Sequence, residues 1–162
     1  MVIRDDHKDT ISIDLSELFG KVMTFSAKDA ERMQPDNPAL ILVMTYKDDA
    51  EFRTYVDKVV MDMTSRIAHL LDQGSIVKDW PYLNIEFSTG CLNPSGLHII
   101  DEAMQSALTY GVLSEYQAGA PGYEIAEQAN KDKYAHALGA LSASSLYRRQ
   151  SPNRAKIKQR FF

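Results

Sequence analysis

The hydrophobic residues between positions 49 and 73 recur at intervals of three and four, which is the spacing of one face of a helix. Asp48 and Glu51 form a capping signal at the start of this stretch, and Gly74 follows its end. The pattern predicts one long amphipathic helix over residues 49–73. We expect its buried stripe to consist of Phe52, Tyr55, Val56, Val59, Val60, Met63, Ile67, Leu70 and Leu71.

Two further stretches have the patterns of strands. In residues 82–88, apolar and polar side chains alternate, which predicts a half-buried strand. Residues 39–46 form a continuous apolar run between a Pro-Asp-Asn-Pro turn and a charged segment. A short unbroken run of this kind predicts a strand that is buried on both faces.

The pattern near the N-terminus is ambiguous. Ile11, Ile13 and Leu15 alternate with polar residues, as in a strand, but the spacing from Leu15 to Phe19 is equally typical of a helix start. Residues 11–25 therefore remain either strand or helix. Ser26, with a carboxylate three positions later, predicts a short helix that ends near residue 34.

The C-terminal half predicts a helix, a β-hairpin and a second helix. Asn93 and Pro94 are typical of a helix start, and Gly111 follows the last residue of the expected helix. Residues 112–127 contain a glycine-rich turn at 118–122 between two apolar segments, which predicts the hairpin. An alanine-rich helix is then expected over residues 129–147.

Residues 95–134 resemble the second half of a winged-helix domain. The resemblance depends on the Tyr-Gly-Val-Leu step at 110–113, the turn at 118–122 and the Tyr-Glu-Ile-Ala-Glu segment at 123–127. It implies a recognition helix followed by a wing. However, that helix carries Asp101 and Glu102 and no Lys or Arg, although phosphate contacts dominate DNA affinity. The departure favours protein docking over DNA binding.

These patterns together predict a single α+β domain over residues 1–147, with a long central helix and a small, mostly antiparallel sheet. The winged-helix-like portion is expected at about 93–147. Residues 148–162 are expected to form a separate basic tail.

The charge is distributed unevenly along the chain. Residues 1–132 contain 11 basic and 22 acidic residues, whereas residues 133–162 contain 7 basic residues and no acidic one. Such a tail is expected to bind an anionic partner, which is either nucleic acid or an acidic protein surface. The alternative is that it lies on the acidic body of its own or a neighbouring subunit. The candidate binding residues are Arg148, Arg149, Arg154, Lys156, Lys158, Arg160, Phe161 and Phe162.

The sequence contains no motif of a known catalytic or metal site. The single cysteine, Cys91, has no partner pattern that indicates a nucleophile, and the four histidines are too widely spaced to predict a metal site. Trp80 is read as a core residue, with an interface anchor as the alternative. We therefore expect no enzyme activity and no cofactor.

Residues 1–10 lack a signal-peptide pattern, and the longest apolar run is too short to span a membrane, so a cytoplasmic protein is expected. The leading hypothesis is a structural subunit of a larger protein assembly, such as a virion or multi-protein complex, with homo-oligomerisation as one form. Its basic and aromatic tail would dock on an acidic surface. The alternative hypothesis is a winged-helix nucleic-acid-binding protein or transcriptional regulator.

Overall fold

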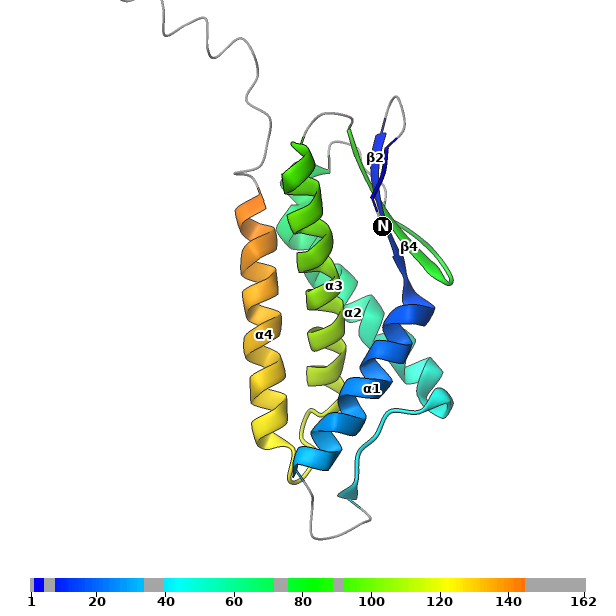
Figure 1. The fold of residues 1–162 in the computed structure, drawn as a ribbon, viewed down its shortest axis with the longest axis vertical. Coiled ribbons are helices and arrows are strands. Elements are labelled where there is room, and N and C mark those ends of the chain that lie inside the picture. Colours follow the sequence, from blue (N-terminus) through cyan, green and yellow to red (C-terminus); the bar gives the residue numbers. More distant parts are fainter. Residues whose placement is uncertain (1, 5–7, 34–39, 72–75, 89–91, 145–162) are drawn as a thin grey trace, which may run out of the picture.

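The computed structural model of the chain describes residues 2–4, 8–33, 40–71, 76–88 and 92–144 (Figure 1). The fold is α+β, as predicted. Four helices lie on one side of a small antiparallel sheet. The elements in chain order are β1 (Val2–Arg4), β2 (Lys8–Asp14), α1 (Leu15–Met33), the 3-10 helix η2 (Tyr46–Asp48), α2 (Asp49–Ile67), the 3-10 helix η3 (Ala68–Leu70), β3 (Ile76–Asp79), β4 (Tyr82–Ser88), α3 (Pro94–Tyr116) and α4 (Glu124–Ser142).

The sheet has the strand order β1-β2-β4-β3, and every neighbouring pair is antiparallel. The predicted alternation of β4 is confirmed, because Leu83, Ile85 and Phe87 are buried. Ile11 and Ile13 of β2 lie opposite Ile85 and Leu83, so both central strands supply apolar side chains to the face that meets the helices. Strands β1 and β3 at the two edges were not predicted.

Residues 11–25 contain both a strand and a helix. The change occurs at Asp14, whose Oδ1 accepts the backbone N–H groups of Ser16 at 2.8 Å and Glu17 at 3.1 Å. These bonds satisfy N–H groups that have no partner within the first turn of a helix. Helix α1 then continues to Met33, so the predicted short helix from Ser26 is the last part of a longer one.

The predicted strand over residues 39–46 is wrong for the residues that the structure describes. Residues 40–45 pair with no strand, and Leu40 and Ile41 are exposed. Side-chain hydroxyl groups take the place of a partner strand, because the Leu42 N–H donates to Tyr123 Oη at 2.9 Å and the Met44 N–H donates to Ser26 Oγ at 3.0 Å. The apolar run therefore covers α1 and the start of α4 as an irregular segment.

Helix α2 confirms the predicted helix over most of its length, and Phe52, Val56, Val59, Met63 and Ile67 are buried as the spacing indicated. Regular α-helix ends at Ile67, and η3 continues to Leu70. The proposed C-terminal cap, Gly74, lies outside the described residues.

The predicted hairpin over residues 112–127 is wrong. Helix α3 begins as predicted, with Asn93 Oδ1 accepting the Gly96 N–H at 2.6 Å, but it continues through Gly111 to Tyr116. The turn was predicted in the right place, and it contains Gly119 and Gly122 at φ values of 71° and 84°. Helix α4 follows it directly. This part of the chain is a helical hairpin, and the wing on which the winged-helix resemblance depended is not formed.

Close packing of the helices explains why a glycine lies inside α3. A Cβ atom at this position would lie 2.7 Å from Val59 Cγ2 and 3.0 Å from Tyr134 Cε2, so glycine is needed where α2 and α4 approach α3 closely. A glycine at a helix crossing and a glycine at a helix end look the same in the sequence.

The hydrophobic core lies between the sheet and the helices. It joins buried residues of β2, β4 and all four helices in one cluster. Helices α3 and α4 run side by side in opposite directions, with α1 and α2 on the side toward the sheet (Figure 1). Among the described residues, no helix is both long and apolar enough to cross a membrane.

Candidate docking surface

A groove of about 590 Å³ lies between α3 and α4. We call it the α3–α4 groove. Its floor is made by small side chains, because Ala103 and Ala137 are buried between the helices and Ala140 is half-buried. Alanine extends only one carbon from the backbone, so the two helices leave space above these positions. Its lining residues are Ile99, Glu102, Ala103, Ser106, Tyr110, Asp132, Lys133, His136, Ala137 and Ala140.

Two carboxylates belong to the groove. Glu102 and Asp132 are exposed, and within the described ranges neither forms an ion pair. Asp132 Oδ1 accepts an amide N–H from Gln128 at 2.8 Å. Lys133, the one lysine in the lining, has its ammonium group 4.7 Å from the centre of the Tyr110 ring. This cation–π contact holds the lysine beside the tyrosine.

At the other end of this helix pair, near the turn that joins α3 to α4, polar side chains connect both helices to α1. Gln117 Nε2 and Asn130 Nδ2 both donate to Asp29 Oδ2, at 2.9 and 3.1 Å, and Asn130 Nδ2 also donates to Gln117 Oε1 at 3.0 Å. Gln117 and Asn130 are buried. We call this network, together with the close contact at Gly111, the closed end. Its polar groups bind one another and serve the fold.

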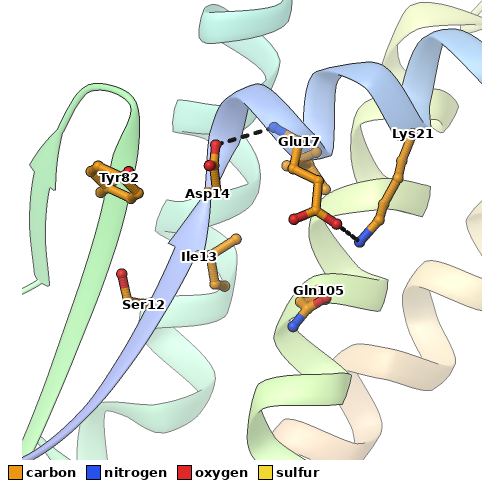
Figure 2. A pocket seen from close by; sticks show the side chains of 8 residues that line it. Ser12, Ile13, Asp14, Glu17, Lys21, Tyr82 and Gln105 are labelled. Carbon is orange, nitrogen blue, oxygen red and sulfur yellow. Dashed lines mark hydrogen bonds and ion pairs between the residues drawn. The ribbon is translucent and has the colours of Figure 1, made fainter. Parts of the chain in front are cut away.

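A second pocket lies where β2 meets α1, near α3 (Figure 2). Its charged side chains are engaged with one another or with the backbone. Asp14 caps α1, and the Glu17 carboxylate lies 2.9 Å from the Lys21 ammonium. Gln105 Nε2 donates to Asp101 Oδ1 at 2.9 Å. Such contacts account for a stable helix start and do not assemble a nucleophile with a base.

The predicted core role of Trp80 is confirmed in part. The ring is half-buried and packs against the core, with its centre 6.2 Å from that of Phe52 in an edge-on arrangement. The guanidinium carbon of Arg53 lies 3.9 Å from the ring centre. The exposed face of the indole is thus covered by an intramolecular cation–π contact.

The surface where α2 meets the last turns of α3 is also acidic. Burial raises the pKa of Tyr116 to about 12, and the carboxylates of Asp48 and Glu51 add to the shift. Burial and the charges of Glu51 and Glu115 also raise the pKa of Tyr55. Glu115 is paired with Lys58 in this region. The lysine of this surface therefore forms an ion pair with a carboxylate, whereas Lys133 of the groove lies over the Tyr110 ring.

Exposed apolar side chains occur at the turn between α3 and α4. Ile125 in the first turn of α4 is 76% exposed, and Ile41 is 52% exposed. The hydrogen bond from the Leu42 N–H to Tyr123 Oη brings their two segments together. The sequence pattern predicted Ile41 inside a buried strand and Ile125 in a wing, so this exposure was not expected.

The residues that the sequence singled out for binding, Arg148 to Phe162, lie outside the described residues, as does Cys91. His98 and His136 are both exposed. Within the described part of the chain, no three His, Cys, Asp or Glu side chains are grouped as metal ligands would be. The sequence did mark Glu102 as unsuited to a DNA-reading helix and residues 129–147 as rich in alanine. These residue types line the groove, but the sequence pattern did not predict that the two helices leave space between them.

Comparisons with protein-family models, with curated proteins and with solved structures find no match for this chain.

Proposed function

We propose that the protein is a non-enzymatic subunit of a larger protein assembly and that the α3–α4 groove is one of its docking surfaces. The observation that carries the proposal is the combination of an apolar floor with the exposed carboxylates of Glu102 and Asp132, which form no ion pair within the described residues. Apolar contact supplies affinity, and the charges select a partner of opposite sign.

The closed end supports this choice by contrast. There, on the same helices, buried polar groups are matched to one another, as expected for groups that only stabilise a fold. In the groove, by contrast, Glu102 and Asp132 are exposed and form no ion pair within the described residues, although Asp132 accepts an amide N–H from Gln128. A basic segment with apolar side chains would fit both features, and the basic tail (148–162) has that composition.

The test uses the full-length protein in the cells from which it comes. An extract is fractionated by size, and the protein is detected in the wild-type form and as Ile99→Arg. Ile99 is 37% exposed in the groove, so the new charge should block docking with little effect on folding. Met61→Arg on α2, where the side chain is 70% exposed, is the matched control.

The wild type and Met61→Arg are expected to elute in a complex, and Ile99→Arg is expected to elute near the monomer mass of 18.2 kDa. Elution of the wild type as a monomer would contradict the assembly function. A complex unchanged by Ile99→Arg would remove the groove from it. Treatment with nuclease distinguishes the alternative, since a complex that nuclease dissolves contains nucleic acid bound by the basic residues.

A further inference from the structure

The chemistry of the groove matches that of the chain's own last residues. Residues 145–162 contain six basic residues and no acidic one, whereas all 22 acidic residues lie earlier in the chain. The same segment contains Phe161 and Phe162. Aromatic rings bury a large area in a groove floored by alanine, and cations complement unpaired carboxylates.

One end of the groove lies close to the last described residues, and the basic segment follows these residues in the sequence. Ala140 lines the groove, and α4 ends at Ser142. On α3 the groove extends from Ile99 to Tyr110, which is roughly 16 Å at the helical rise per residue. An extended chain advances about 3.3 Å per residue, so the 18 residues that follow Ser144 are long enough to turn back and cover it.

Attachment to the same chain favours this segment over other occupants. A short tether raises the effective concentration of a binding segment to about the millimolar range. A free partner segment of similar affinity would need a comparable concentration to compete. The surface between α2 and the last turns of α3 is also acidic, but there Glu115 is already paired with Lys58, whereas Lys133 of the groove contacts the Tyr110 ring.

We propose that residues 148–162 of the same chain occupy the α3–α4 groove, with Glu102 and Asp132 binding the basic side chains. This inference rests on the proposed docking role of the groove. It makes the groove a site for basic, aromatic peptide segments, for which the chain's own segment competes with those of partner proteins.

The test is the binding of a fluorescent synthetic peptide of residues 145–162 to full-length proteins, followed by anisotropy. One protein is the wild type. The other, the tail variant, carries Phe161→Ser and Phe162→Ser with Arg154, Lys156, Lys158 and Arg160 changed to Gln. The peptide is expected to bind the tail variant about tenfold more tightly than the wild type, because only the wild type competes with its own segment.

Groove substitutions in the tail variant locate the site. Glu102→Lys with Asp132→Lys is expected to weaken peptide binding at least tenfold. Glu51→Lys with Asp79→Lys changes the net charge equally at other exposed positions, one of them on the α2–α3 surface, and should weaken binding less than threefold. Ile99→Ser should weaken it, whereas Ile125→Ser in the same helix pair should not.

Three results would overturn the proposal. The first is equal binding to the wild type and the tail variant, and the second is no binding to either at millimolar peptide. The third is a wild type that dimerises at micromolar concentration in sedimentation while the tail variant stays monomeric, since the occupant is then the segment of a second copy. None of these depends on the size of the complex in cell extracts, so this inference can fail while the assembly function stands.

Discussion

Helices α3 and α4 contact each other in two different ways along their length. At the closed end, Gly111 allows close approach, and Gln117 and Asn130 join α1 through Asp29. At the α3–α4 groove, alanines leave space, and two exposed carboxylates form no ion pair within the described residues. The difference separates residues that specify the fold from residues that are available to a partner. Substitutions in the two regions should therefore have opposite effects on stability and on binding.

The largest effect on stability is expected from Gly111→Val. A Cβ at this position would lie 2.7 Å from Val59 Cγ2. Both this neighbour and the introduced valine are β-branched and have few rotamers, so neither side chain can move aside. We expect a loss of roughly 2–3 kcal/mol in the free energy of unfolding, measured by urea denaturation.

The matched control for Gly111→Val is Gly139→Ala. This glycine is also inside a helix, but an added Cβ would meet nothing within 4 Å. Because alanine is the better helix former, the control should gain about 0.5–1 kcal/mol. No loss in Gly111→Val would show that the packing around Gly111 can accommodate a side chain, and an equal loss in the control would show that the effect does not depend on the contact with Val59.

The second effect concerns the buried amide of Gln117. Gln117→Leu removes one of the two N–H groups that Asp29 Oδ2 accepts and leaves Asn130 with one partner fewer. A partly buried carboxylate that loses a hydrogen-bond donor destabilises the fold. We therefore expect the free energy of unfolding, measured by urea denaturation, to fall by about 2 kcal/mol. Gln128→Leu removes a similar amide bond to Asp132 at an exposed position and should change stability by less than about 0.5 kcal/mol.

These contacts also show how far the sequence could lead. Regular periodicity predicted α2 and β4 because each buries one face, and Asn93 with Pro94 marked the start of α3. Positions 111 and 112–117 were misread because a glycine at a helix crossing and a glycine at a helix end have the same local pattern. Only the positions of Val59 and Tyr134, distant in sequence, decide between them.

The prediction of a strand that includes residues 40–45 was wrong for a related reason. The apolar composition of this segment is that of a strand, but its backbone groups are satisfied by the hydroxyls of Ser26 and Tyr123. The groove, too, depends on side chains from two helices whose pairing was not predicted. The sequence did show the residue types that line the groove, which are the acidic residues of α3 and the small residues of α4.

The third effect is a loss of stability at high pH. The pKa of Tyr116 is raised to about 12, and burial together with the hydrogen bond to Asp62 raises the pKa of Tyr134. In the unfolded chain tyrosine deprotonates near pH 10, so above that pH the unfolded state binds fewer protons than the folded state. Stability is therefore complete below about pH 10 and should fall as the pH rises toward 12.

The urea midpoint measured at a series of pH values tests this fall, with tyrosinate absorbance as the second readout. Tyr116→Phe removes one of the titrating groups and should make the decline shallower. A urea midpoint that stays constant between pH 10 and 12 would show that these tyrosines are no more protected in the folded state than in the unfolded chain.

The smallest effect on stability is expected at the groove, and it is the sharpest test of the comparison. Glu102→Lys with Asp132→Lys reverses two exposed charges that have no ion-pair partner in the described residues, so the free energy of unfolding should change by less than about 0.5 kcal/mol. Glu115→Lys is the control, because it breaks the pair with Lys58 at a half-buried position and should cost about 0.5–1 kcal/mol. If the groove substitutions were the more destabilising, the two carboxylates would belong to the fold. A stable groove variant that no longer binds the peptide would instead assign them to recognition.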